Sequence, residues 1–427
     1  MKLAVFGLGV MGQYSIKELA PKAEVVYVRD SNPQYEVGEI FPNIRNIQVA
    51  ETDEAAVKDA DFVLFCVPTH NVSDQMGKVL PYCKKNAIIT GQTSRKTPEA
   101  QAFDEHLSRN PHCGLELVTI HTMCNPSKSN ASKEILGIVK HNSTREAYER
   151  ARRFYGGLSE HIEDFESVED HDKMVANTQI NTSKTFLSIA SAFARVGCFP
   201  RLNETYSSSL DVMKFSLAMR IASQEPHVYR GIQFGSEYGK DLVREAVRVE
   251  SELYEMVVGD RKKDYKQRVL AAKKKLFWGR SKPILDDAVL KQFGELVVDD
   301  PNSHFSIVQW AVDSAESGRD IFGELKATTP MYTALLCLTD RLFNTDELER
   351  SIEAPFNDSR LRSDDLAFHD EIHGWSDALL FDNMSAYDAR HQQMRSKVDE
   401  KLLQEQTEKS KEIIKVCRES LAKSDSL

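Results

Sequence analysis

The sequence has no apolar run long enough to cross a membrane. None of its stretches approaches the roughly 18 consecutive apolar residues that a transmembrane helix needs. The first residues predict a strand, which leaves no room for a signal peptide. Seven cysteines, an odd number without paired spacing, indicate free thiols in a reducing compartment. We therefore expect a cytoplasmic protein with no membrane partner.

Metal-binding motifs and basic clusters are missing as well. The chain contains no C-x-x-C pairs and no H-E-x-x-H motif, so we expect no metal. Its formal net charge is −10, and no lysine or arginine cluster reverses that sign locally, which argues against a nucleic-acid partner. Cys124 falls in a candidate active-site loop, but no base stands beside it, so we do not expect a nucleophile there.

The residues that are present divide the chain into parts. At 427 residues it is too long for one ordinary core. Ten of the 20 glycines lie at or before Gly157, whereas all three tryptophans follow it. From His171 onward the pattern is of long amphipathic helices, such as residues 171–195 and 240–276. We expect a dinucleotide-binding domain, a helical substrate and dimerisation domain, and a charged C-terminal helix, over residues 1–168, 169–385 and 386–427.

The most informative stretch is a strand that runs into a glycine-rich turn. Residues 2–6 are mostly apolar, and Gly-Leu-Gly-Val-Met-Gly follows before a helical pattern. A G-x-G-x-x-G motif in this context predicts a dinucleotide pyrophosphate bound at a helix N-terminus. The cofactor-binding residues expected here are Gly7, Leu8, Gly9, Val10, Met11 and Gly12.

Further strands alternate with helical stretches through the first part of the chain. They are predicted near residues 24–30, 47–50, 62–68, 87–90, 117–120 and 134–140, and around His161. This alternation predicts an α/β Rossmann domain, a doubly wound and mostly parallel sheet, followed by an all-α domain. Ligands bind at the carboxyl ends of such strands, where we place Val67, Pro68 and Thr69 as cofactor-binding residues.

The end of the second predicted strand bears on the choice of cofactor. Asp30 lies 18 residues after Gly12, about where an acid receives the adenosine ribose hydroxyls of NAD. Arg29 and Ser31 flank it, and an arginine there can hold the extra phosphate of NADP. Arg29 is equally well interpreted as a surface charge. We favour NADP and keep NAD open.

Three residues are candidates for chemistry in a hydride transfer. Oxidation of a carbon that bears a hydroxyl requires a base, usually histidine. His121 follows a predicted strand at the cofactor edge, so we interpret it as a base rather than as a structural histidine. Ser94 lies in the neighbouring loop and could orient that histidine or the substrate. Arg220 is a cation on an apolar helical face and needs an anion, either an internal acid or a substrate carboxylate.

Several separated motifs together resemble the prephenate dehydrogenases, most closely the fungal-type NADP-dependent enzymes. They are residues 7–12, 91–96 (Gly-Gln-Thr-Ser-Arg-Lys), the strand end at His121, residues 169–173 with 178–179, and residues 219–229, 301–304 and 328–330. The resemblance spans residues 1 to about 345. It implies oxidative decarboxylation of prephenate to 4-hydroxyphenylpyruvate in tyrosine biosynthesis, with hydride transfer to NAD(P)+. It also implies a homodimer formed through the helical domain.

The resemblance implies roles for individual residues. His121 would accept the hydrogen bond of the ring hydroxyl and act as base, Ser94 would support it, and Arg220 would bind a substrate carboxylate. Bacterial members carry Ser-His-x-x-His where this chain has Thr-Gln-Ile-Asn-Thr at residues 178–182, and fungal-type members share the Thr-Gln. We assign further substrate contacts to Gln179, His227 and His304, although a structural role suits either histidine better than a catalytic one.

Three alternatives stay open. Arogenate differs from prephenate only in carrying an amine in place of the side-chain keto group. A β-hydroxyacid dehydrogenase would use a lysine four residues before an asparagine, a spacing that Lys173 and Asn177 have, although the glycine-rich approach to that lysine is absent. A non-catalytic dinucleotide-sensing protein is disfavoured because both His121 and Arg220 are present.

Overall fold

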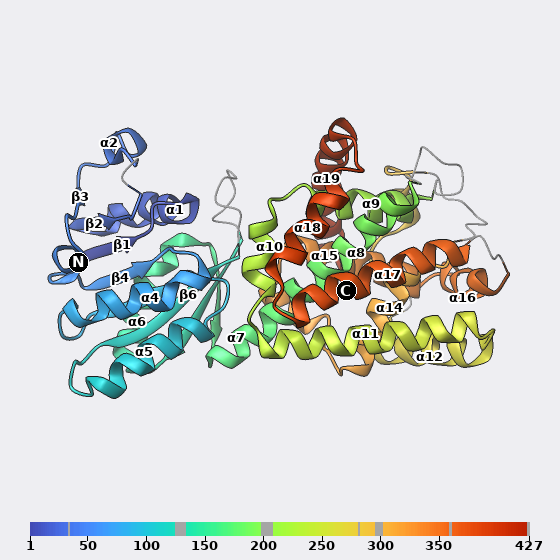
Figure 1. Ribbon diagram of the computed structural model, residues 1–427, viewed down its shortest axis with the longest axis horizontal. Helices are drawn as coiled ribbons and strands as arrows, with labels where there is room; N and C mark the ends of the chain where they lie inside the picture. Colours follow the sequence, from blue (N-terminus) through green and yellow to red (C-terminus); the bar gives the residue numbers. More distant parts are fainter. Residues whose placement is uncertain are drawn as a thin grey trace. The chain divides into compact units, whose positions relative to one another are not determined.

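The chain folds into two compact units, Met1–Val175 and Ala176–Leu427. The computed structural model describes residues 1–32, 35–123, 134–197, 208–280, 282–294, 302–357 and 361–424 (Figure 1). Cys124 therefore lies outside the described residues. From the sequence we placed the end of the first domain at residue 168, a few residues before the division between the two units.

The first unit is built on one eight-stranded sheet with the strand order β3-β2-β1-β4-β5-β6-β7-β8. Neighbouring strands are parallel except for the antiparallel pair β6 and β7. The strands are β1 (Lys2–Phe6), β2 (Val25–Arg29), β3 (Ile47–Val49), β4 (Phe62–Phe65), β5 (Ile88–Gly91), β6 (Glu116–Thr122), β7 (Ile135–His141) and β8 (His161–Phe165). The predicted doubly wound, mostly parallel sheet is confirmed.

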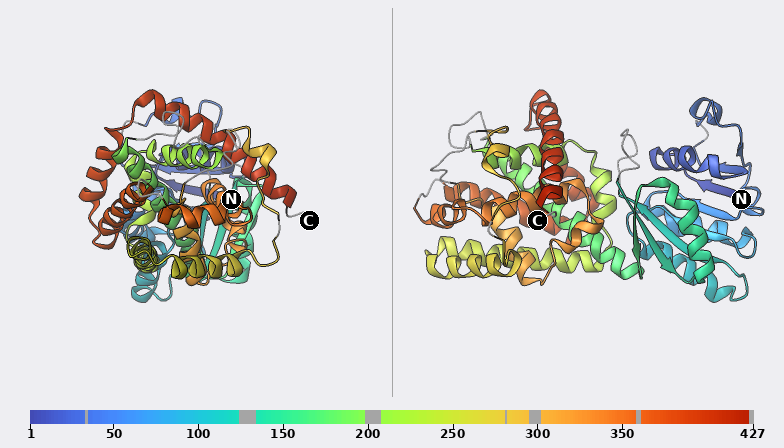
Figure 2. Two further views of the ribbon diagram at one scale, coloured as in Figure 1. Left: turned by 90° about the vertical axis from the view of Figure 1, so that its right-hand side faces the viewer. Right: turned by 180° about the vertical axis from the view of Figure 1, so that it is seen from behind.

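Helices cover both faces of this sheet, as Figures 1 and 2 show. They are α1 (Val10–Leu19), α2 (Val37–Ile40), α3 (Asp53–Val57), α4 (Thr69–Val79), α5 (Thr97–Arg109), α6 (Arg145–Tyr155) and α7 (Val168–Val175). Because both faces are covered, β4 is apolar and buried along its whole length. Strand order reverses between β1 and β4, which marks their carboxyl ends as the place where an open α/β sheet binds ligands.

The second unit is helical throughout its described elements, as predicted. They are α8 (Asn181–Val196), α9 (Ser209–Ala222), α10 (Pro226–Gln233), α11 (Glu237–Val258), α12 (Lys262–Leu276), α13 (Asp287–Leu290), α14 (Phe305–Glu316), α15 (Pro330–Phe343), α16 (Glu347–Asn357), α17 (Leu361–Leu380), α18 (Met384–Arg395) and α19 (Glu400–Ser424). Its core includes Trp310, Trp375 and Tyr332. Residues 386–427 contribute most of α18 and all of α19, and α19 packs on α9 and α15 within the unit.

One predicted helix has a different form. The pattern at residues 171–195 predicted a single uninterrupted helix, but the structure has a π-helical turn, Ala176–Ile180, between α7 and α8. A π turn shifts the helical register by one residue without breaking the apolar stripe, so the pattern did not reveal it. Such turns are often found at functional sites. This one includes Gln179, one of the predicted substrate contacts.

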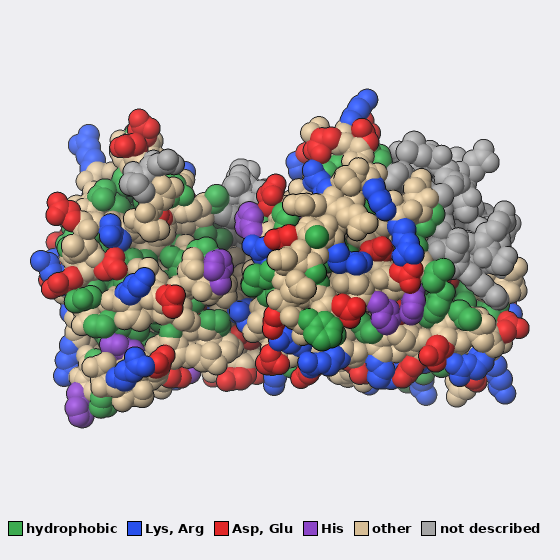
Figure 3. All heavy atoms as spheres, viewed as in Figure 1, with side chains coloured by type: hydrophobic (Ala, Val, Ile, Leu, Met, Phe, Trp, Pro, Cys, Tyr) green, Lys and Arg blue, Asp and Glu red, His purple; other side chains and the backbone are tan. Residues whose placement is uncertain are grey.

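The surface and the described helices bear on the expected partners. No described helix combines the length and apolar character that crossing a membrane requires. On the face drawn in Figure 3, acidic and basic side chains are interspersed. Cys66, Cys83, Cys113, Cys337 and Cys417 are free thiols.

Candidate active site

The glycine-rich turn after β1 has the shape of a phosphate cradle. Gly7 has a φ of +96°, and a Cβ there would lie 2.5 Å from the carbonyl oxygen of Cys66. A Cβ at Gly12 would overlap the carbonyl oxygen of Gly7. A Cβ at Gly9, by contrast, would meet no atom within 4 Å. The fold itself therefore requires Gly7 and Gly12, whereas Gly9 leaves open space where a ligand can approach the backbone.

The first turn of α1 is suited to an anion. Gly9 is its N-cap, no side chain caps it, and the turn contains no acidic residue. The exposed N–H groups and the helix dipole therefore favour a negative group there. Val10 is 58% exposed, unusual for valine, whereas Leu8 is buried. A dinucleotide pyrophosphate fits this turn in charge and in space, and the nicotinamide cofactor would supply a hydride acceptor when bound.

The acid and the arginine at the end of β2 both have partners within the unit. Asp30 accepts hydrogen bonds from the backbone N–H groups of Leu8, at 2.5 Å, and Asn32, at 2.7 Å, so its carboxylate holds the glycine turn in place. Arg29 Nε lies 3.2 Å from Asp53 Oδ1, with the arginine side chain 37% exposed. Ser31 is exposed. These contacts leave the choice between NADP and NAD to experiment.

The segment after β4 lies beside the glycine turn. Thr69 begins α4, and Pro68 is its exposed N-cap. Val67 Cγ1 is 3.3 Å from the position of a Cβ built on Gly7. The three predicted cofactor residues of this segment therefore follow the strand end next to β1, and their contact with a cofactor stays a prediction.

His121 lies near the end of β6, and a second histidine holds its ring. Its Nδ1 is 3.0 Å from Nε2 of His171, a residue of α7. The Nδ1 of His171 is 2.8 Å from Oδ1 of Asp172. The Asp172 carboxylate also accepts hydrogen bonds from the backbone N–H groups of Lys96 and Thr97 and from the Thr97 hydroxyl, at 2.8, 2.9 and 2.6 Å. The two histidines thus connect to a carboxylate that is anchored at the start of α5.

The direction of this hydrogen-bonded chain follows from the charge at its end. Burial opposes ionisation of Asp172, but hydrogen bonds from His171 and the start of α5 outweigh it and lower its pKa to about 2. An ionised Asp172 only accepts, so Nδ1 of neutral His171 donates to it and Nε2 of His171 accepts from Nδ1 of His121. Nε2 of neutral His121 then carries the lone pair, which is the state that a general base needs.

The surroundings keep both rings neutral. Burial lowers the pKa of His121 well below its ordinary value, and His171 and Lys96 lower it further. Burial also lowers the pKa of His171, against the opposing effect of Asp172. His121 therefore remains a base at pH values where an exposed histidine would already be protonated.

A buried ion pair supports the strand end from below. Lys96 and Glu99 are completely buried and lie 3.1 Å apart, and Lys96 Nζ also donates to the carbonyl oxygens of Gly91 and Ile120. Glu99 accepts hydrogen bonds from the Thr93 backbone and the Thr119 hydroxyl. A Cβ at Gly91 would overlap the Glu99 carboxyl group, which explains why β5 ends in glycine.

A second contact connects the His121 strand end to the glycine turn. Gln92 Nε2 donates to the Thr122 hydroxyl at 3.0 Å, and Thr122 Oγ1 is 3.1 Å from the sulfur of Met11. The candidate base and the dinucleotide cradle are therefore neighbours within the first unit. Ser94 lies half-buried in the segment after β5. Among the described residues, the His121 ring bonds to His171 and not to Ser94, so support from Ser94 stays a prediction.

Arg220 lies near the end of α9 in the second unit. It is half-buried, and its guanidinium is 3.5 Å from the Ser410 hydroxyl of α19. Among the described residues, no carboxylate lies within ion-pair distance of it. Of the two anions expected from the sequence, an internal acid is therefore not found in the described part of the unit.

Two polar side chains of the second unit lack partners in the same segment where bacterial relatives carry histidines. Gln179 Nε2 and Thr182 Oγ1 are buried, and neither atom has a hydrogen-bond partner within the described residues. Buried polar groups nearly always have one. Water or a polar ligand would satisfy both, and Gln179 is one of the predicted substrate contacts.

The other predicted substrate contacts differ in their surroundings. His227 is exposed on α10. His304 is buried at the start of α14, with a φ of 45°, and its Nδ1 lies 3.7 Å from Asp211 Oδ1. Asp211 also pairs with Lys214 and accepts from Asn302. This setting favours a structural role for His304.

The lysine and asparagine of the alternative dehydrogenase are engaged separately. Lys173 is exposed on α7. Asn177 donates to Glu324 at 2.9 Å, and its carbonyl oxygen accepts from Arg319 at 3.0 Å. Asn177 thus has a structural place in the second unit.

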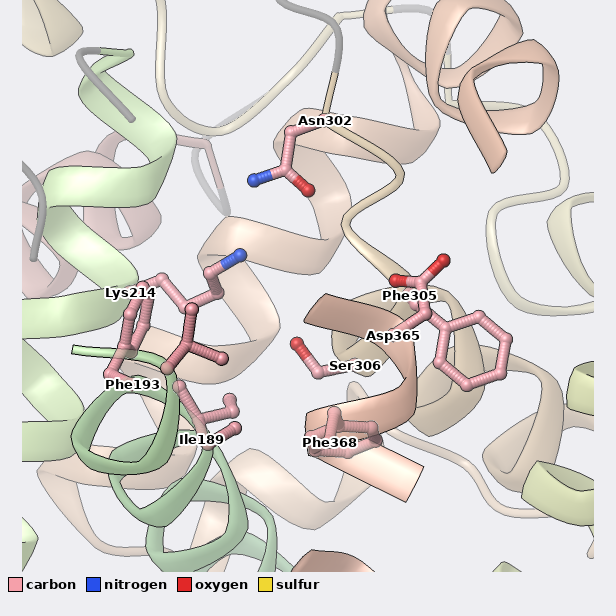
Figure 4. Close-up of a pocket in the computed structure, with 10 residues that line it drawn as sticks. Ile189, Phe193, Lys214, Asn302, Phe305, Ser306, Asp365 and Phe368 are labelled. Atoms are coloured by element: carbon pink, nitrogen blue, oxygen red, sulfur yellow. The ribbon is translucent and has the colours of Figure 1, made fainter. Parts of the chain in front are cut away.

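A cavity of about 490 Å³ lies within the second unit among α8, α9, α14 and α17 (Figure 4). Phe193, Phe305 and Phe368 make much of its lining apolar, and Lys214 and Asp365 reach it. Lys214 pairs with Asp211, and Asp365 accepts from Ser303 at 2.6 Å. The cavity contains none of the site residues predicted from the sequence.

Comparison with known families places the chain. The model of the NAD binding domain of 6-phosphogluconate dehydrogenase matches residues 2–115. A second model, a variant of the 6-phosphogluconate dehydrogenase C-terminal domain, matches residues 180–419, more than half of the chain. The chain belongs to this second family.

Named relatives match the chain over nearly its whole length. Prephenate dehydrogenase [NADP(+)] of Saccharomyces cerevisiae is 25% identical over 92% of this chain and 89% of the relative. Probable prephenate dehydrogenase [NADP(+)] of Schizosaccharomyces pombe is 23% identical over 91% of each chain. The crystal structure of Synechocystis arogenate dehydrogenase is 16% identical, with a TM-score of 0.48, over 62% of this chain and 95% of that chain. The resemblance expected from the sequence is confirmed.

Sequence reasoning missed the residues that position His121. His171 and Asp172 lay in a motif that contributed to the resemblance, but we gave them no role, and Lys96 and Glu99 were likewise unassigned. Adjacent histidine and aspartate at the start of a helix, together with a histidine at a strand end, formed the signal available. Only the packing of α7 against β7 and α5 brings these residues to the end of β6.

Proposed function

We propose that this chain oxidises prephenate to 4-hydroxyphenylpyruvate and carbon dioxide, with transfer of a hydride to NADP+. The observation that carries the proposal is the oriented pair His121 and His171, placed next to a dinucleotide cradle. It supplies a neutral imidazole whose lone pair is fixed by Asp172. The names of the two fungal relatives supply the substrate and the cofactor.

The chemistry asks little of the protein beyond positioning. Nε2 of His121 accepts the hydrogen bond of the ring hydroxyl and draws its proton as the hydride leaves the same carbon. Carbon dioxide departs from the opposite ring carbon, its bonding electrons make the ring aromatic, and the proton returns to the phenol oxygen. Aromaticity supplies much of the driving force, and the residues hold the reacting groups in place.

Arg220, Gln179 and Thr182 are the proposed contacts to the substrate's carboxylates and keto group. Arg220 is a cation without an acidic partner in the described residues, and a carboxylate would complete it. Gln179 Nε2 and the Thr182 hydroxyl are buried, and the described residues offer them no partner. His227 and His304 remain weaker candidates, because one is exposed and the other lies beside Asp211.

The biological setting follows from the same proposal. The product is the direct precursor of tyrosine, so we place the enzyme in tyrosine biosynthesis in the cytoplasm. We also propose a homodimer formed through the helical unit, a small-molecule substrate, and no nucleic-acid or membrane partner. Size-exclusion chromatography with light scattering tests the dimer.

A coupled assay tests the activity. Purified protein with prephenate and NADP+ should form NADPH and 4-hydroxyphenylpyruvate in equal amounts. Arogenate in place of prephenate should react much more slowly, and a preference for arogenate would assign the alternative substrate. NADPH binding without turnover of either compound would indicate a sensing protein. Turnover of small hydroxyacids that Lys173→Ala abolishes would indicate a β-hydroxyacid dehydrogenase.

A further inference from the structure

Three side chains of the second unit converge in a way that the proposed reaction does not use. Glu250 lies on α11, and His369 and His373 lie on α17. His369 Nδ1 is 2.9 Å from Glu250 Oε2, and His373 Nε2 is 3.1 Å from the same oxygen. One ligand atom from each residue lies within 4.8 Å of the others. Two nitrogens and one carboxylate oxygen therefore face a single point.

The burial of the cluster is uneven. Glu250 is completely buried, whereas the His369 and His373 side chains are 25% and 34% exposed. A buried carboxylate is costly unless a cation compensates its charge. The imidazoles form the side of the cluster that solvent can reach, so an ion can enter there without any opening of the helical core.

The arrangement of the three ligands is that of a metal site. Histidines four residues apart lie on one face of a helix, and the carboxylate comes from a facing helix. Zn²⁺ binds imidazole nitrogen at about 2.0–2.1 Å and carboxylate oxygen at about 2.0–2.2 Å. A tetrahedral ion with such bonds holds its ligand atoms about 3.3–3.5 Å apart. The distances in the structure need to widen by only a few tenths of an ångström.

The neighbours of the cluster fix its geometry. The ring of Tyr254 stacks on His369, with centroids 4.3 Å apart and an angle of 16° between the planes. The Ser251 hydroxyl lies 3.0 Å from His373 Nε2, where it could hold a water in an open coordination position. Residues around metal ligands commonly orient them in this way.

We propose that Glu250, His369 and His373 bind a divalent transition-metal ion, with Zn²⁺ as the expected occupant, which cross-links α11 and α17. The motifs read from the sequence did not indicate this site, since Glu250 stands 119 residues before His369 and the histidine pair lacks the glutamate of an H-E-x-x-H motif. The competing interpretation is a hydrogen-bonded carboxylate that shares a proton with one histidine, because the bond to Glu250 raises the pKa of His369.

Calorimetric titration of the full chain with ZnCl₂, after removal of metal with EDTA, separates the two interpretations. The wild type should bind one Zn²⁺ per chain at this site. Glu250→Gln keeps the shape of the side chain and should weaken binding by more than the roughly 10–100-fold that loss of an outer-shell partner costs. His112→Ala removes an exposed histidine of the first unit and should bind like the wild type. Equal affinity in the wild type and Glu250→Gln would overturn the proposal.

Two further measurements keep the test independent of folding defects. Zn²⁺ should raise the melting temperature of the wild type and of His112→Ala but not that of Glu250→Gln, because only a ligand that binds the folded state stabilises it. X-ray absorption of the zinc-loaded wild type should show nitrogen and oxygen neighbours at about 2.0–2.1 Å, with the multiple scattering of imidazole. Sulfur neighbours at about 2.3 Å would assign the ion to cysteines and contradict the proposal.

Discussion

The two units treat their buried polar groups in opposite ways. In the first, the His121 and His171 rings both have partners, and the chain of hydrogen bonds ends on a carboxylate anchored at the start of a helix. In the second, Gln179 Nε2 and the Thr182 hydroxyl are buried, and neither has a hydrogen-bond partner in the described part of the unit. The first arrangement fixes a base before any ligand arrives. The second leaves hydrogen-bonding capacity that a ligand or water can satisfy.

This difference corresponds to two separate tasks. A base must be held in one tautomer, and full satisfaction of its partners achieves that. A group that binds substrate does best when its hydrogen bond forms only in the complex. An unsatisfied buried polar group costs about 1–3 kcal/mol in the free protein. Mutations in the two units should therefore change different kinetic constants.

Loss of the base should have the largest effect. In His121→Asn the ring nitrogen that accepts the substrate's proton is gone, and general-base catalysis contributes about 10²–10⁴-fold. We expect kcat to fall by that factor while the Kd for NADPH, measured by fluorescence titration, stays the same. A variant that retained full kcat would remove His121 from the mechanism.

Breaking the far end of the hydrogen-bonded chain should cost less. In Asp172→Asn the His171 ring loses its charged acceptor, His121 is no longer confined to one tautomer, and kcat should fall by roughly 10–100-fold. Thr97→Val is the matched control, because it removes a hydrogen bond to the same carboxylate without touching either histidine. That variant should keep near-normal kcat. If both variants lost kcat equally, Asp172 would act only by anchoring α5.

The pH profile of kcat/KM distinguishes positioning from a general structural role. The lowered pKa of His121 places the acid limb of the wild type below the ordinary histidine range near 6.5, because the neutral base survives to lower pH. The negative charge of Asp172 raises the pKa of His121. Its removal in Asp172→Asn should therefore move the acid limb to still lower pH, whereas Thr97→Val should leave it in place.

Cofactor choice should respond to a single arginine by about tenfold. If Arg29 exchanges its half-exposed bond with Asp53 for the 2′-phosphate of NADP, Arg29→Ala loses a charge-assisted hydrogen bond worth about 1.5–3 kcal/mol in full, less in partial solvent. Then kcat/KM for NADP+ should fall about tenfold while the value for NAD+ stays the same. An unchanged ratio would place the phosphate elsewhere, and a strong wild-type preference for NAD would reverse our choice of cofactor.

Much of the fold followed from local patterns. The apolar strands, the glycine turn and the helical second half all left clear periodicities, because each element must bury one face or one whole strand. The π turn at Ala176–Ile180 did not, since it changes register without changing composition. His121 was predictable because a strand end in a parallel sheet has only one edge to reach.

The partners of the site residues were not predictable in the same way. His171 lies 50 residues after His121, and Glu250 lies 119 residues before His369. Nothing in the spacing of such residues indicates contact, because loop and helix packing alone bring them together. Sequence therefore indicated which groups could react, and tertiary structure was needed to show which groups orient them.

The smallest predicted effect tests the unsatisfied side of the comparison. Thr182→Val replaces a buried hydroxyl, for which the described residues offer no partner, with a methyl group of similar shape, so the free protein should gain about 1 kcal/mol and melt about 2–4 °C higher. The KM for prephenate should rise roughly 2–10-fold through loss of one neutral hydrogen bond, with little change in kcat. Thr339→Val is the matched control, because the Thr339 hydroxyl is buried but donates to Leu335 at 2.8 Å. It should bring no such gain in stability and leave KM unchanged. A Thr182→Val protein that was less stable and bound prephenate normally would show that this hydroxyl serves the fold instead of the substrate.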